Sequence, residues 1–150
     1  MLRRSVVALA FVTAVACCGA ASAQSVAPTK VVAPEKLAGY WAMVHSSVEA
    51  DVPNIAKNID RPGCATVSFV VGSNGNTGNI KVERVVPEGD FRQIAESMAK
   101  NLHFEPTLSN TGRQPVKSWL IFPFNLPADP VARKAVMQPC VIDKLGAGTP

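Results

Sequence analysis

Two cysteines, two histidines and scattered carboxylates are the residues beyond position 23 that could carry chemistry. A cysteine nucleophile needs a nearby base that activates the thiol and a group that orients the base. Cys64 and His103 could approach each other if their segments pack together, but Cys140 offers Cys64 a disulfide partner. We therefore weigh a thiol enzyme against a structural disulfide, and favour the disulfide.

The histidines and the sequence motifs indicate no metal site and no other catalytic site. His45 has no second histidine or cysteine at the spacing that metal sites use. His103 stands at the end of a predicted helix, where a histidine can simply bond the last carbonyls. The sequence has neither a G-x-S-x-G element nor a glycine-rich phosphate loop. We predict no catalytic residues, no metal, no cofactor and no small-molecule substrate, and therefore no enzyme.

The first 23 residues have the layout of a secretory signal peptide. Arg3 and Arg4 precede an apolar run from Val6 to Ala16, which is followed by the small-residue cleavage site Ala21-Ser22-Ala23. We predict that this segment is removed, that Gln24 becomes the N-terminus, and that the protein is periplasmic.

Two alternatives for the same segment stay open. If residues 5–23 are retained they would anchor the chain in the inner membrane, although a span needs roughly 20 apolar residues and this run is interrupted. A lipid on Cys17 would instead make a lipoprotein, because the residue before this cysteine is small.

Removal of the signal peptide changes both the charge and the cysteine count. The whole chain of 150 residues carries a net charge of +4, and loss of Arg3 and Arg4 leaves thirteen basic against eleven acidic residues. This balance does not predict nucleic-acid binding, which needs a clustered basic face. Cys64 and Cys140 remain, and an even count in an exported protein predicts one disulfide.

We divide the mature chain into three parts. Residues 24–33 are expected to form a flexible leader, and residues 34–126 one folded domain. Residues 127–150 form a C-terminal tail that the predicted disulfide ties back to the domain. A mature chain of this length suffices for one small domain with a single core.

The domain is expected to begin with a helix. Pro34 suits the first helical position. Leu37, Trp41, Val44 and Val48 follow at spacings that place them on one helical face.

A hairpin follows this helix. Alternating apolar residues from Ala65 to Val71 predict a strand with one dry face. Asn74-Gly75 can supply the positive φ angles of a tight turn, and the run from Asn79 to Val86 predicts the second strand.

A second helix and a third strand complete the pattern. Asp90 and Gln93 resemble a capping box, and Pro106 prevents the chain from continuing as a helix. The third strand is expected over Val116–Leu126. The helix stripe consists of Phe91, Ile94, Ala95, Met98 and Leu102, and one face of the strand consists of Ser118, Leu120, Phe122 and Phe124.

The order of these elements predicts an α+β fold. An N-terminal helix precedes a β-β-α-β unit. Its three strands form an antiparallel sheet in the order 2-1-3, with the helices packed on one face.

The stretch from Val52 to Leu126 resembles the C-terminal domain of the TonB energy-transducer family. The shared features follow one another in order: Gly63, the alternating TVSFVV, the Asn-Gly turn, NIKV, the amphipathic helix, LHFEP, Gly112, QPV and a last strand ending FPFNL. The resemblance implies a domain that grips a short segment of an outer-membrane receptor as an added β-strand. It implies a protein partner, which is such a receptor or another envelope protein.

Two functions follow from this resemblance. A transducer needs a membrane anchor and a long spacer, whereas a cleavable-looking signal and about ten residues of leader precede this domain. We therefore expect a periplasmic binding module. The alternative is a membrane-anchored energy transducer for outer-membrane transport, if residues 5–23 are an uncleaved span.

The expected partner surface is the edge formed by the third strand. Pro123 lacks a backbone donor, which is tolerated on sheet edges. Lys117, Trp119 and Ile121 face away from the predicted core, and Trp119 is the expected anchor. The alternatives are that the leader or the tail covers the edge, or that two copies pair through it. The predicted partner-binding residues are Val116, Lys117, Ser118, Trp119, Leu120, Ile121 and Phe122.

Overall fold

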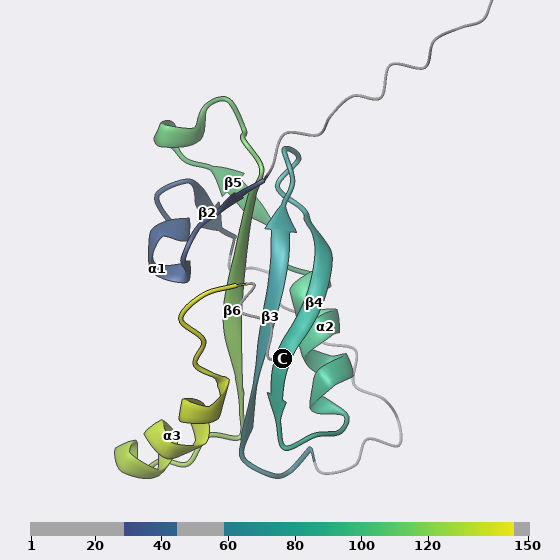
Figure 1. Cartoon of the computed structure of the whole chain (residues 1–150), viewed down its shortest axis with the longest axis vertical. Coiled ribbons are helices and arrows are strands. Elements are labelled where there is room, and N and C mark those ends of the chain that lie inside the picture. Colours follow the sequence, from purple (N-terminus) through teal and green to yellow (C-terminus); the bar gives the residue numbers. More distant parts are fainter. Residues whose placement is uncertain (1–28, 45–58, 146–150) are drawn as a thin grey trace, which may run out of the picture.

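The computed structural model describes residues 29–44 and 59–145, and within them the fold is a mixed α+β arrangement (Figure 1). The elements in chain order are β1 (Lys30–Val31), α1 (Pro34–Leu37), β2 (Trp41–Met43), β3 (Gly63–Val71), β4 (Thr77–Val86), α2 (Phe91–Lys100), β5 (Phe104–Pro106), the 3₁₀ turn η2 (Leu108–Asn110), β6 (Val116–Phe124), α3 (Pro130–Met137) and the 3₁₀ turn η3 (Gln138–Cys140).

The main sheet has four strands in the order β1-β6-β3-β4, and a second sheet pairs β2 with β5. The central strand β3 is antiparallel to both β4 and β6, whereas β1 runs parallel to β6. The predicted three-stranded sheet is therefore wrong in strand number and in full order, although its three strands are neighbours as β4-β3-β6. Strands of two or three residues are too short to show a period in sequence, which explains the omission of β1, β2 and β5.

The long N-terminal helix is a wrong prediction. Helix α1 ends at Leu37, and Trp41 lies instead in β2, opposite Pro106 of β5. Trp41 is only 1% exposed, and its indole N–H donates to the Gln114 carbonyl oxygen at 3.1 Å. Burial of the Trp41 ring and the pairing of β2 with β5 stabilise a strand here, although the spacing of Leu37, Trp41 and Val44 fits a helix. Val48 lies outside the described residues.

The core lies between α2 and one face of the sheet. The alternating residues of β3 and the predicted stripe of α2 meet there, as the sequence pattern predicted. Phe69 stacks on Phe104 with ring centroids 5.8 Å apart, and Phe91 stacks on Phe124 at 4.3 Å. Phe104 thus enters the core from β5, two residues before Pro106.

The turn between β3 and β4 follows the expectation only in part. Gly75 has a φ of 83°, but Asn74 does not share the left-handed region. The Asn74 carboxamide oxygen instead accepts the Asn76 N–H at 3.0 Å. Similarly, Asp90 stands at the N-cap of α2 without making a side-chain cap hydrogen bond, so the predicted capping box does not form.

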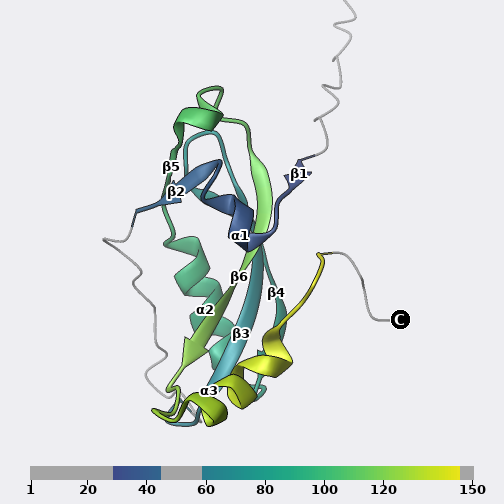
Figure 2. The same cartoon turned by 90° about the vertical axis from the view of Figure 1, so that its left-hand side faces the viewer.

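Helices and turns lie on both faces of the main sheet. Figure 2 shows α2 on one side of β3 and β6, with α3 and the chain after it on the other. The prediction of helices on one face is therefore wrong. The tail folds into α3 and η3 and returns over the opposite face, which is where Cys64 and Thr66 point.

Candidate partner-binding edge

Strand β6 is paired along its whole length with β3 but only at its start with β1. Residues Val116–Phe124 face Gly63–Val71 in an unbroken antiparallel register. On the other side, Lys30 and Val31 lie opposite Val116 and Lys117. Among residues 29–44 and 59–145, no strand pairs with this side of β6 after Lys117.

One hydrogen bond shows which backbone groups of β6 point outward. The Val32 N–H donates to the Lys117 carbonyl oxygen at 2.8 Å, so Lys117 directs its backbone away from β3. Successive residues of a strand alternate in this respect. Trp119, Ile121 and Pro123 therefore also direct their N–H and C=O positions outward.

Pro123 fits this alternation. It lies opposite Cys64 of β3, at a position whose nitrogen points away from that strand. A proline there costs the sheet no ladder bond, since the missing donor would have faced outward. The segment from Trp119 to Pro123 thus offers two N–H donors and three carbonyl acceptors along one line. We call these five residues the open edge.

The seven predicted partner-binding residues divide between the two faces of the sheet. Val116, Ser118 and Phe122 are buried on the side of α2, and Leu120 is half-buried there. The Ser118 Oγ is buried without a hydrogen-bond partner in the described part of the chain. Lys117, Trp119 and Ile121 lie on the opposite face. The side chains on the α2 side therefore belong to the fold, and the backbone N–H and C=O groups of these four residues face β3, so they offer a partner no free group.

Trp119 is 6% exposed, although it faces away from the main core. It lies opposite Ser68 of β3, on the face over which the chain after Cys140 returns (Figures 1 and 2). Because the ring is already buried in the free protein, an anchoring contact would require whatever covers the ring to move. Its role as an anchor remains a prediction.

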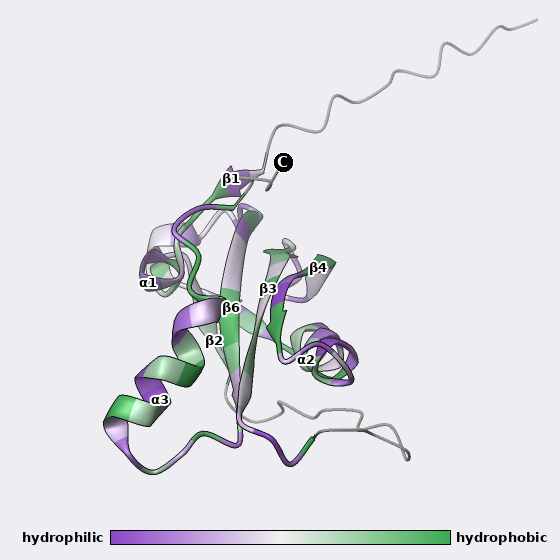
Figure 3. Ribbon diagram, turned by 60° about the horizontal axis from the view of Figure 1, so that its bottom comes forward, coloured by the Kyte–Doolittle hydropathy of each residue, from purple (hydrophilic) through white to green (hydrophobic). Residues whose placement is uncertain are grey.

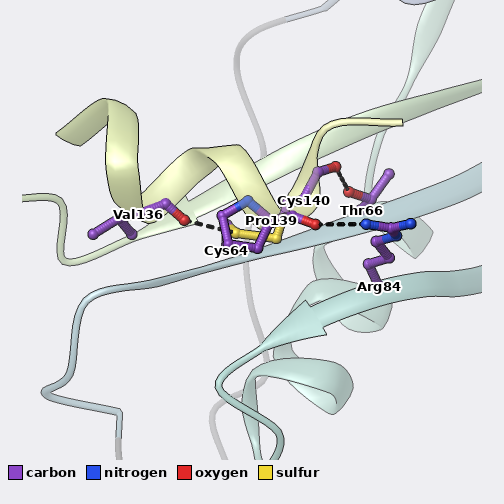
Figure 4. Close-up of a disulfide and its surroundings, with 6 residues drawn as sticks. All are labelled: Cys64, Thr66, Arg84, Val136, Pro139 and Cys140. Carbon is purple, nitrogen blue, oxygen red and sulfur yellow. Dashed lines mark hydrogen bonds between the residues drawn. A yellow bond between two sulfur atoms is a disulfide. The ribbon is translucent and has the colours of Figure 1, made fainter. Parts of the chain in front are cut away.

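The tail is held to this face by the disulfide between Cys64 and Cys140. The S–S distance is 2.00 Å, and both residues are completely buried. Figure 4 shows two strand side chains that bond the same turn: Thr66 donates to the Cys140 carbonyl, and Arg84 donates to the Pro139 carbonyl at 3.1 Å. The predicted pairing of the cysteines is present in the structure.

The disulfide removes the candidate thiol from nucleophilic chemistry. Cys64 Sγ carries no proton in this state, so its 3.2 Å approach to the Val136 carbonyl oxygen is a contact rather than a donated hydrogen bond. His103 lies elsewhere, with Nδ1 2.8 Å from the Asn76 side-chain oxygen. Cys64 and His103 therefore do not form a catalytic pair, and His45 lies outside the described residues.

A charged cluster borders Trp119 on the tail-covered face. The Glu83 carboxylate accepts bonds from Ser68 Oγ and Lys81 Nζ, each at 2.8 Å. Burial raises the pKa of Glu83, but these two bonds and the charges of Lys81 and Lys117 outweigh burial, so the pKa lies below its ordinary 4.5. Glu83 is thus ionised and neutralised at neutral pH, which suits a structural network rather than a general acid.

Two segments of this region escaped the sequence patterns. Strand β1 carries no periodic signal, but α3 has a recognisable start. Asp129 caps it by accepting the Ala132 N–H at 2.7 Å, and Pro130 occupies its first turn. That Asp-Pro pair is a helix-start signal that could have been found. Helix α3 has no buried residue, and hydrophobic and hydrophilic residues mix along it (Figure 3).

The described residues contain neither a metal-binding cluster of histidine, cysteine or carboxylates nor a helix long and apolar enough to cross a membrane. The predicted signal peptide lies outside them, so cleavage at Gln24 remains a prediction.

Comparison with known proteins places the sequence in one family. Its model, described as Gram-negative bacterial TonB protein C-terminal, matches residues 50–126, about half of the chain. A solution structure of the Pseudomonas aeruginosa TonB C-terminal domain is similar, with 22% identity and a TM-score of 0.41, over 59% of this chain and 89% of that one. No curated protein matches the sequence. The chain belongs to the TonB C-terminal domain family.

Proposed function

We propose that this chain is a periplasmic protein-binding module that takes up an extended segment of an outer-membrane receptor as an added strand on the open edge. The observation that carries the proposal is the outward backbone of Trp119, Ile121 and Pro123, which no described strand pairs. An unpaired edge is a template for another extended chain.

Membership of the family supports the proposal at a coarser level. TonB C-terminal domains are non-enzymatic protein-interaction domains of the Gram-negative envelope. The disulfide in place of a free thiol at Cys64 agrees with a binding role rather than a catalytic one.

Amide exchange tests the proposal residue by residue. In the free protein, the Trp119 and Ile121 amides should exchange faster than those of Ser118 and Leu120, which face β3. Synthetic peptides covering the N-terminal periplasmic segments of the outer-membrane receptors from the same bacterium serve as probes. A peptide that binds should slow exchange at Trp119 and Ile121. Slowed exchange that depends on protein concentration, without peptide, would instead show two copies pairing.

The matching substitution is Ile121→Pro. It removes an outward donor, and the neighbouring Pro123 shows that β6 accommodates proline at such a position. We expect binding of that peptide, measured by calorimetry, to weaken at least about tenfold, because one hydrogen bond is lost and the ring obstructs the partner backbone.

Ile121→Ala is the control, because it shortens the side chain and keeps the donor. It should bind within about threefold of the wild type. A folded Ile121→Pro protein that binds the peptide as tightly as Ile121→Ala would refute strand addition at this edge.

A further inference from the structure

Strand β1 occupies the start of the edge that the proposed partner would use. The backbone of Lys117 points away from β3, as do those of Trp119, Ile121 and Pro123. Its carbonyl oxygen, however, already accepts the Val32 N–H. A partner strand running along β6 towards Val116 would therefore meet Val32 and β1. At the opposite end Pro123 offers no donor, and Asn125 has a φ of 44° that turns the chain out of the strand.

The attachment of β1 is made of few contacts. Its two residues are exposed, with Val31 at 52%, so their side chains contribute little to packing. The Val32 side chain enters the core at 4% exposure. Lys30 Nζ donates to the Tyr40 hydroxyl at 2.5 Å and lies 4.6 Å from the centre of that ring. A short, solvent-exposed pairing of this kind opens more easily than the central ladder.

We propose that β1 is a built-in stop that restricts the partner to a short strand on the open edge, and that its release lengthens the binding site. This inference rests on the proposed function and adds what determines the length of the segment bound. With β1 in place, a docked strand matches the five residues from Trp119 to Pro123. With β1 released, Lys117 regains an outward donor and an outward acceptor, and the edge covers the nine residues of β6.

The parallel direction of β1 provides a matched pair of substitutions. Across from Lys117 stands Val31, whose own N–H points away from β6, whereas the N–H of Val32 points towards it. Val32→Pro therefore removes a donor to β6, and Val31→Pro places the same ring one residue away without removing one. Val32→Ala separates loss of the buried side chain from loss of the donor.

The experiment compares two lengths of one receptor peptide. The probes are the receptor segment that binds the wild-type protein, trimmed to five residues, and the same segment at nine residues. Wild-type protein should bind both with affinities within about threefold. Val32→Pro should bind the nine-residue probe about tenfold more tightly than the five-residue one, because further backbone hydrogen bonds form. Val31→Pro and Val32→Ala should behave as the wild type.

The outcomes separate this inference from the proposed function. Equal affinity of the two probes for a folded Val32→Pro protein, with short-probe binding intact, overturns the stop while strand addition stands. A nine-residue probe that gains as much on wild-type protein as on Val32→Pro also overturns it. Binding that survives Ile121→Pro overturns strand addition itself. Amide exchange at Lys117, faster in Val32→Pro than in Val31→Pro, verifies that β1 has been released.

Discussion

Trp119 lies on the face of β6 that its place in the alternating pattern predicts, and it is nevertheless buried. Period 2 determines the face on which a side chain lies, so Ser118, Leu120 and Phe122 could be placed towards α2 from sequence alone. The pattern contains nothing about what covers the other face. That depends on a tail whose return is determined by Cys140 and by bonds to Thr66 and Arg84.

The burial of Trp119 leads to a stability prediction. Trp119→Ala should lower the free energy of unfolding by about 3 kcal/mol, because a large buried ring is removed and a cavity remains. Urea unfolding followed by circular dichroism measures the change. Val131→Ala is the control: Val131 is 78% exposed on α3 and should change stability by no more than about 0.5 kcal/mol. Unchanged stability of Trp119→Ala, together with lost peptide binding, would show an anchoring ring instead.

At the scale of elements, prediction succeeds where a pattern is long and local. Strands β3, β4 and β6 and helix α2 have nine or ten residues each, which is enough to show period 2 or 3.6. Their boundaries follow the sequence closely. Helix α1 and strand β2 fail because Leu37 and Trp41 alone cannot distinguish a helical stripe from a helix followed by a strand. The place of β6 beside β3, with its other side towards the sheet edge, was predicted, and whether that edge is covered was left open; the pairing of β1 with its start depends on contact between distant segments.

The β3–β4 turn gives a prediction for an element that the sequence identified. Gly75 has a left-handed φ, and a Cβ there would overlap the carbonyl oxygen of Phe104. Gly75→Ala should therefore lower the free energy of unfolding by about 2 kcal/mol or more. Gly78→Ala is the matched control, since its Cβ would meet nothing within 4 Å and its φ is ordinary. Thermal unfolding should distinguish the two, and equal stability would contradict the turn geometry.

At the scale of the whole molecule, one covalent bond joins the tail to the central strand. Cysteine counting predicted the Cys64–Cys140 pair, because an exported chain with two cysteines has a single choice of bridge. It could not predict that the tail would cross the face opposite α2, which is also the face on which Trp119 lies. That consequence follows from the direction in which Cys64 points, which alternates with the core-facing Ala65.

Removal of the bridge should therefore affect both stability and the covered face. The bond joins positions 76 residues apart, and such a closure restricts the unfolded chain strongly. The double variant Cys64→Ala/Cys140→Ala should lose about 2–4 kcal/mol of unfolding free energy. With the tail released, the indole N–H resonance of Trp119 should shift, while that of Trp41, which bonds Gln114, should not. Reducing the wild-type protein should reproduce both changes, and the double variant treated with the same reductant is the control. Two titratable thiols in protein from an oxidising compartment would contradict the disulfide. An unchanged Trp119 resonance after the disulfide is cut would contradict its role in holding the tail over this face.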